Sequence, residues 1–144
     1  MSAEEHFRKL ERMYGRAPCN GYYSPRLTIS KGAAEVVIPI QQKFHHAVGA
    51  VHGSVYFKAL DDAAFFAVNS LVEDVFVLTA SFNIFLFRPV ASGQMKAIGR
   101  VIQESKNIFV AEATLTNSEG EEVARGIGTY ARSRAALSPD IGYS

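Results

Sequence analysis

The sequence predicts an α+β domain in which a curved, largely antiparallel sheet of about six strands covers one long buried helix. Residues 53–71 place apolar side chains on almost every face of a helix, which is typical of a buried helix. Six other segments have strand patterns, and those after the helix are separated by tight turns rather than by the helical crossovers of parallel strands. Because no other element is apolar enough to cover a sheet, we expect the strands to curl around this helix.

The composition limits the kinds of protein that this chain can be. Its 144 residues, 48% of them hydrophobic, are expected to form one domain over residues 1–144. A net charge of +1 provides no basic surface for binding phosphates, so no nucleic-acid partner is expected. No segment has the roughly 18 consecutive apolar residues of a membrane span, and the N-terminus lacks the apolar region of a signal peptide. We therefore expect a cytoplasmic protein with no membrane partner.

The two ends of the chain have different patterns. Residues 2–14 are expected to form a short amphipathic helix with Phe7 and Leu10 on its apolar side. A cluster of glycine, proline and asparagine ends this helix, and His6 on it is expected to face solvent. Residues 133–144 show no periodicity, so we expect a loosely held tail.

The six predicted strands are residues 26–30, 34–40, 76–87, 93–104, 108–117 and 122–132. A turn at Lys31 and Gly32 joins the first two. The alternation is clearest in residues 108–117, where apolar and more polar side chains follow one another in turn along the strand. Such alternation is typical of an antiparallel sheet with one face covered.

Two adjacent aspartates lie within the predicted central helix. Asp61 has only Phe57 and Phe65 one turn away along its own stripe, so no cation is available there. Asp62 has Lys58 four residues before it, and we expect these two side chains to form an ion pair. A carboxylate in apolar surroundings is costly unless it is paired or its pKa shifts, and such acids are frequent at functional sites. Asp61 is therefore the candidate functional acid.

Several motifs occur in a fixed order within residues 44–132: His52-Gly53, Asp61, Asn69-Ser70 at the helix end, Ser81-Phe82-Asn83 and Arg88-Pro89. In these motifs the chain resembles the hotdog-fold acyl-CoA thioesterases, specifically the phenylacetate-pathway group called PaaI-like. The resemblance implies that Asp61 is the catalytic carboxylate, either as a general base on water or as a nucleophile. It also implies that His52 and the backbone N–H of Gly53 support the thioester carbonyl.

Three further positions are compared with the family pattern. His46 stands where members of the family commonly have an asparagine, and its imidazole is able to hold the attacking water instead. Ser54 replaces a second glycine after Gly53. Thr79 falls where relatives carry a serine, and the resemblance implies that its hydroxyl helps to orient the water or the leaving group.

The spacing along the helix has a consequence of its own. Unpaired N–H groups at the helix N-terminus, those of Gly53 and Ser54, can polarise a carbonyl oxygen, and Asp61 supplies a base or nucleophile. Gly53 and Asp61 are eight residues apart, roughly 12 Å along a helix, which is too far for both to act on one carbonyl carbon. Either they belong to different sites or two chains share each site in a two-fold dimer. The resemblance implies such a dimer, and a tetramer of two dimers stays open.

The predicted substrate-binding residues are Ser54, Phe57, Phe65, Asn69, Phe85, Arg88 and Lys106. The phenylalanines, with Phe87 as an alternative to Phe85, would line an acyl chamber, and the basic residues would meet the phosphates of coenzyme A, as would Arg132. No cofactor is expected beyond the coenzyme A of the substrate. No metal site is expected either, because no carboxylate or thiolate lies at ligand spacing beside the loop histidines.

Together these residues predict an acyl-CoA thioesterase that converts a small aryl or a short- to medium-chain acyl-CoA into the free acid and CoA. Two alternatives stay open. Acyl-thioester hydratases and dehydratases pair a histidine with an acid, a part that His52 could take, and they yield no free thiol. A non-catalytic acyl-CoA-binding module would bind its ligand without turnover. The acyl group itself cannot be named from the sequence.

Overall fold

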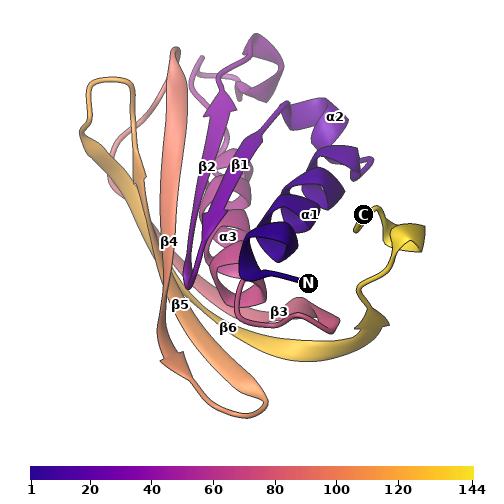
Figure 1. Ribbon diagram of the computed structural model, residues 1–144. Helices are drawn as coiled ribbons and strands as arrows, with labels where there is room; N and C mark the ends of the chain where they lie inside the picture. The colour runs from indigo at the N-terminus through magenta and orange to yellow at the C-terminus, as the bar shows by residue number, and fades with distance from the viewer.

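In the computed structural model, which describes residues 1–144, one antiparallel sheet of six strands curves around a long helix (Figure 1). The helices are α1 (Ala3–Arg16), α2 (Asn20–Tyr23) and α3 (Gly53–Asn69). The strands are β1 (Arg26–Ser30), β2 (Ala33–Pro39), β3 (Val75–Leu86), β4 (Gln94–Glu104), β5 (Ile108–Thr116) and β6 (Glu122–Ala136). Two 3-10 turns complete the order, η1 (Gln42–Phe44) and η2 (Pro139–Ile141). The predicted α+β architecture is confirmed.

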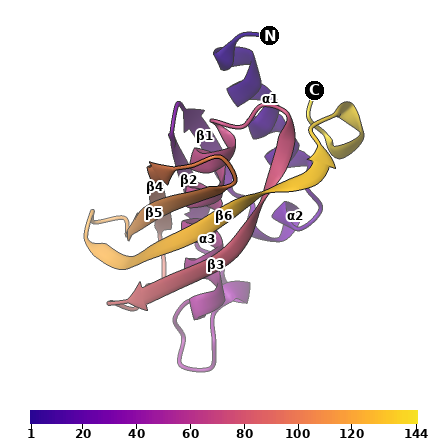
Figure 2. The ribbon, with the colours of Figure 1, turned by 90° about the horizontal axis from the view of Figure 1, so that it is seen from below.

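The strands follow the order β1-β2-β4-β5-β6-β3 across the sheet. All neighbouring strands are antiparallel, as the tight turns predicted. Seen from below, β3 runs beside β6 as the last strand of the sheet, with α3 behind them (Figure 2). The outer edge of β3 therefore pairs with no other strand of this chain.

One side chain caps the start of the central helix, and another fixes the turn that follows its end. His52 is the N-cap, and its Nδ1 accepts a hydrogen bond from the Ser54 N–H at 3.0 Å. At the other end, the buried amide of Asn69 donates to the carbonyls of Val72 and Val75 and accepts from the Val77 N–H. These contacts fix the turn into β3, which places the side chains of β3 against α3.

No helix of this chain is long and apolar enough to cross a bilayer.

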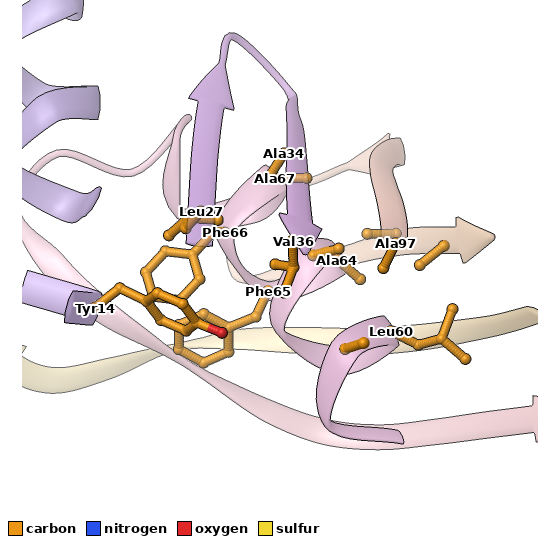
Figure 3. Close-up of a cluster of buried hydrophobic side chains, with 14 of the residues drawn as sticks. Tyr14, Leu27, Ala34, Val36, Leu60, Ala64, Phe65, Phe66, Ala67 and Ala97 are labelled. Atoms are coloured by element: carbon orange, nitrogen blue, oxygen red, sulfur yellow. The ribbon is translucent and has the colours of Figure 1, made fainter. Parts of the chain in front are cut away.

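The core forms where α3 lies on the sheet. The absence of a side chain at Gly99 lets β4 approach α3 closely, because a Cβ there would clash with the backbone of Ala63. Figure 3 shows larger side chains in the remaining space, where the Phe66 ring packs edge-on against Tyr14 and at a tilt against Phe65. The ring of Tyr14 comes from α1, so α1 packs onto the same core as the sheet.

The C-terminal segment differs from the prediction. Strand β6 continues to Ala136, four residues beyond the predicted end, and Tyr143 is buried rather than loosely held. Its hydroxyl lies 2.7 Å from Nδ1 of His6, and the Nε2 of His6 lies 2.9 Å from the carbonyl oxygen of Asn69. His6 is fully buried, so its predicted exposure to solvent is also wrong. The polar partners of both residues lie far away in the sequence, which local periodicity does not reveal.

Candidate active site

The carboxylate of Asp61 is held by two hydroxyl groups from the edge of the sheet. The Thr79 Oγ1 donates to Asp61 Oδ1 at 2.9 Å, and the Tyr130 hydroxyl donates to the same oxygen at 3.0 Å. Thr79 and Tyr130 are direct partners in the β3–β6 ladder, so the sheet register sets both donors. Both bind the same oxygen, and Oδ2 accepts no hydrogen bond from the protein. One oxygen of the carboxylate is thus fixed and the other is free.

Burial raises the pKa of the Asp61 carboxyl above its ordinary value. The hydrogen bonds from Thr79 and Tyr130 oppose this rise, because they stabilise the ionised form. The charge of the neighbouring Asp62 raises the pKa further. Asp61 is therefore a stronger base than a solvent-exposed aspartate, as the apolar surroundings in the sequence predicted.

Asp62 has a different environment, although it is adjacent in the sequence. Its Oδ2 lies 2.8 Å from the Lys58 Nζ and accepts a hydrogen bond of 2.6 Å from the Tyr14 hydroxyl. The predicted Lys58–Asp62 ion pair is therefore confirmed. The Lys58 ammonium also lies 5.1 Å from the ring centroid of Tyr23. Asp62 thus holds α1 against α3, and this role accounts for its charge.

Asp61 lines a cavity of about 770 Å³. Aromatic side chains from α3 and β3, those of Phe65, Phe66 and Phe76, form part of its wall. Other parts come from the two ends of the chain, and Lys58 and Asp62 also face it. Of the predicted acyl-chamber residues, Phe65 is at this cavity. Phe57 and Phe85 are not, and neither is the alternative Phe87.

The N-terminus of α3 lies at a second, smaller cleft of about 310 Å³, whose lining includes His46, Gly53, Tyr56 and Arg88. The structure thus brings together three predicted residues, His46, Gly53 and Arg88. As the first residue of α3, Gly53 has a backbone N–H with no acceptor inside the helix. This N–H also donates no hydrogen bond to a loop or to a capping group. The Ser54 N–H, by contrast, is used by His52, so the expected contact of Ser54 N–H with a carbonyl oxygen is not available.

The cleft at Gly53 and the cavity at Asp61 have no lining residue in common. Within one chain, the Gly53 N–H and the Asp61 carboxylate therefore open onto different spaces. This separation agrees with the roughly 12 Å that eight helical residues span.

Several predicted substrate contacts lie elsewhere. Asn69 is fully buried at the C-terminal end of α3, where three hydrogen bonds engage its amide, so the structure contradicts its predicted substrate contact. Phe57 packs edge-on against Phe82, with ring centroids 5.5 Å apart, and Phe85 is 60% exposed near the end of β3. Lys106 lies in the exposed turn between β4 and β5 and lines neither cavity.

Tyr130 and Tyr14 belong to this region but were not predicted. The alternation along residues 122–132 places Tyr130 on the covered face, and that was the available signal. Its contact with Asp61 depends on β6 lying beside β3, a pairing of strands that are not consecutive in the chain. Across the whole chain, no group of three or more His, Cys, Asp or Glu side chains is arranged to bind a metal ion.

For the thioester hydrolysis that the sequence predicts, we expect Tyr130→Phe to shift the acid limb of the kcat/KM profile to higher pH. In the wild type, the hydrogen bond from Tyr130 lowers the pKa of Asp61. The phenylalanine variant lacks this hydrogen bond, so the pKa of Asp61 rises and the base is ionised only at a higher pH. We also expect kcat at the pH optimum to fall by about tenfold, because Oδ1 loses one of its two donors. In Tyr143→Phe, where the lost hydroxyl contacts His6 instead, the acid limb should stay in place. An unmoved limb in Tyr130→Phe would show that Tyr130 does not act on Asp61.

Comparison with known proteins places the chain in a family. The sequence pattern of the thioesterase superfamily matches residues 48–124, more than half of the chain. A proposed esterase of Saccharolobus solfataricus is 24% identical over 104 residues, 72% of this chain and 74% of that protein. The structure of the E. coli PaaI protein, from the phenylacetic acid degradation operon, aligns with a TM-score of 0.85 at 20% identity, over 94% of this chain and 99% of that one. A thioesterase family protein from Silicibacter pomeroyi aligns with a TM-score of 0.81 at 24% identity, over 90% and 97% of the two chains. The chain therefore has the hotdog fold and belongs to the thioesterase superfamily.

Proposed function

We propose that the protein is an acyl-CoA thioesterase that hydrolyses a small aryl or a short- to medium-chain acyl-CoA to the free acid and CoA. The observation that carries this proposal is the state of Asp61. Its carboxylate has a raised pKa, one oxygen fixed by two hydroxyl groups and the other free, and it lies in the wall of a largely apolar cavity. An acid of this kind is suited to activate water or to attack a carbonyl carbon beside an apolar acyl group.

In the proposed reaction, Asp61 Oδ2 removes a proton from water as the water attacks the thioester carbonyl, or attacks that carbon itself. The Thr79 and Tyr130 hydroxyl groups hold Oδ1, so the free oxygen keeps its direction toward the substrate. Negative charge develops on the carbonyl oxygen, and the Gly53 N–H at the positive end of the α3 dipole stabilises it. Collapse of the tetrahedral intermediate breaks the C–S bond and releases the CoA thiolate, a good leaving group, which takes up a proton from Asp61 or from solvent. Where Asp61 itself attacked, collapse leaves a mixed anhydride on Asp61, and water then hydrolyses it to the free acid and regenerates the carboxylate.

The site is proposed to form between two chains, with Gly53 of one subunit facing Asp61 of the other. The unpaired edge of β3 supports this arrangement, because an exposed edge strand readily pairs with another strand. Three large apolar side chains are exposed at or just after the end of β3: Phe85, Leu86 and Phe87. A second copy placed antiparallel along β3 would cover them and bring two equivalent sites together.

Arg88 is the proposed contact for the phosphates of coenzyme A. It lines the cleft at Gly53, where the thioester carbonyl would lie, and it is exposed. Its ion pair with Glu121 is long, at 3.6 Å, and both side chains are about half exposed, so a phosphate can compete for the guanidinium.

The His52 imidazole caps α3 through its Nδ1, which accepts a hydrogen bond from the Ser54 N–H. The product formed distinguishes hydrolysis of the thioester from hydration of an alkene. Incubation of the protein with a panel of acyl-CoAs, with free thiol detected by a thiol reagent, tests the proposal. We expect thiol release that depends on the enzyme. Formation of a hydrated or dehydrated thioester would indicate a hydratase, and binding without any product would indicate a non-catalytic acyl-CoA-binding module.

A further inference from the structure

The walls of the Asp61 cavity come largely from the two ends of the chain. One side comes from the end of α1 and the segment that follows it: Met13, Arg16, Ala17, Pro18 and Cys19. Another side comes from the C-terminal turn, residues 139–142: Pro139, Asp140, Ile141 and Gly142. Both segments lie outside residues 48–124, the part of the chain that matches the family pattern. Most of the residues that line this cavity therefore lie outside the matched region.

The C-terminal turn is held in a fixed place against α1. The Arg16 guanidinium donates to the Gly142 carbonyl at 2.9 Å and to the Ser144 hydroxyl at 2.6 Å. Arg12 donates to the Ser144 carbonyl at 2.7 Å, and the buried Tyr143 hydroxyl contacts His6. Figure 2 shows the end of the chain beside α1, on the side to which β6 leads it. A turn that is anchored in this way forms a wall of the cavity.

The cavity combines a single candidate catalytic acid with a largely apolar lining. Its apolar side chains include Met13, Phe65, Phe66, Phe76 and Ile141. Its volume of 770 Å³ lies in the range of about 300–1,000 Å³ of pockets that enclose drug-sized ligands. A two-carbon acyl group would leave most of this apolar surface uncovered, whereas a medium-length alkyl chain would cover much of it.

We propose that this cavity binds the acyl group, that the preferred substrates are medium-chain acyl-CoAs, and that Ile141 in the C-terminal turn sets the accepted chain length. This inference rests on the proposed thioesterase function, since it places the carbonyl carbon at Asp61 and directs the chain toward residues 139–142. Ile141 is the large aliphatic side chain that the turn contributes to the lining. Its size therefore decides how far the chain can extend.

The test compares hydrolysis of acetyl-, butyryl-, hexanoyl-, decanoyl- and dodecanoyl-CoA by the wild type and two variants. We expect Ile141→Trp to lower kcat/KM for decanoyl-CoA by about tenfold or more, because the larger side chain occupies the path of the distal carbons. Butyryl-CoA should be hydrolysed within about twofold of the wild-type rate, because its chain ends before the turn. Ile141→Ala should move the optimum toward longer chains.

Ile108 offers a matched control, because it is also isoleucine, is 44% exposed where Ile141 is 42% exposed, and does not line the cavity. Ile108→Trp should keep the wild-type chain-length profile. The proposal is overturned if the profiles of both Ile141 variants equal that of the wild type, or if Ile108→Trp shifts the profile as strongly. A fall in Ile141→Trp for every chain length alike, together with an unchanged optimum in Ile141→Ala, would also contradict it.

A binding measurement separates this inference from the proposed function. S-decyl-CoA, a thioether that cannot be hydrolysed, is titrated into each protein by calorimetry. We expect the wild type to bind it and Ile141→Trp to bind it about tenfold more weakly. If the wild type releases no thiol from any acyl-CoA but shows this difference in binding, the proposed thioesterase function is rejected and the assignment of the cavity as the acyl-binding site is supported. If the wild type hydrolyses acyl-CoAs and both proteins bind S-decyl-CoA equally, the chamber assignment fails alone.

Discussion

Asp61→Asn is expected to lower kcat for acyl-CoA hydrolysis by at least about a hundredfold, because the amide can neither accept the proton of the attacking water nor attack the carbonyl carbon. The substitution is nearly isosteric, and the Thr79 and Tyr130 hydroxyl groups can still donate to the amide oxygen. We therefore expect the fold and KM to change little. Thiol release under saturating acyl-CoA measures kcat, and thermal unfolding measures stability.

The neighbouring acid provides the control for this variant. Asp62→Asn removes the charge that pairs with Lys58 and weakens the contact with Tyr14, so we expect the free energy of unfolding to fall by about 1–3 kcal/mol. Its kcat should stay well above that of Asp61→Asn when both proteins are folded. Equal loss of kcat in the two variants, or wild-type turnover in Asp61→Asn, would remove Asp61 from its proposed role.

Gly53→Pro is expected to lower kcat by about 10²–10³ through the loss of one N–H at the start of α3. Proline has no backbone N–H, and it fits the first position of a helix, so the substitution removes the donor while the helix is kept. His52 already has φ −64° and ψ 144°, a conformation that a following proline accepts. The measurement is again thiol release, with helix content followed by circular dichroism.

Gly53→Ala distinguishes the effect of losing the N–H donor from the effect of adding a side chain at this position. A Cβ at this position would lie 3.2 Å from Cδ1 of Leu86, at the end of a flexible side chain that can move aside. Alanine keeps the N–H, so we expect its kcat to remain within about tenfold of the wild type. If the alanine and proline variants lose activity equally, crowding at Leu86 rather than the missing N–H explains the loss.

The features that the sequence predicts correctly are those set by local spacing. The position of α3, its nearly all-round apolar surface and the Lys58–Asp62 pair at four residues all follow from helical periodicity. The strands follow from alternation and from the turns between them. The family resemblance implied that the Thr79 hydroxyl orients the water or the leaving group. The structure shows this hydroxyl 2.9 Å from Asp61 Oδ1, and its role toward water or leaving group stays a prediction.

The features that the sequence does not predict depend on contacts between distant segments. Tyr130 reaches Asp61 because β6 pairs with β3, and strand order in a sheet cannot be read from alternation. The burial of His6 depends on Tyr143, which is 137 residues away. For the same reason, the contribution of the C-terminal turn to the Asp61 cavity could not be anticipated from a segment without periodicity.

The proposal that two chains share each site is tested most directly by mixed dimers. Asp61→Asn and Gly53→Pro chains with different affinity tags are coexpressed, and the dimer that carries both tags is purified. Each homodimer is expected to be nearly inactive. If Gly53 of one subunit acts with Asp61 of the other, the mixed dimer keeps one intact site of two and should recover about half of the wild-type activity. A mixed dimer as inactive as the two homodimers would contradict the shared site.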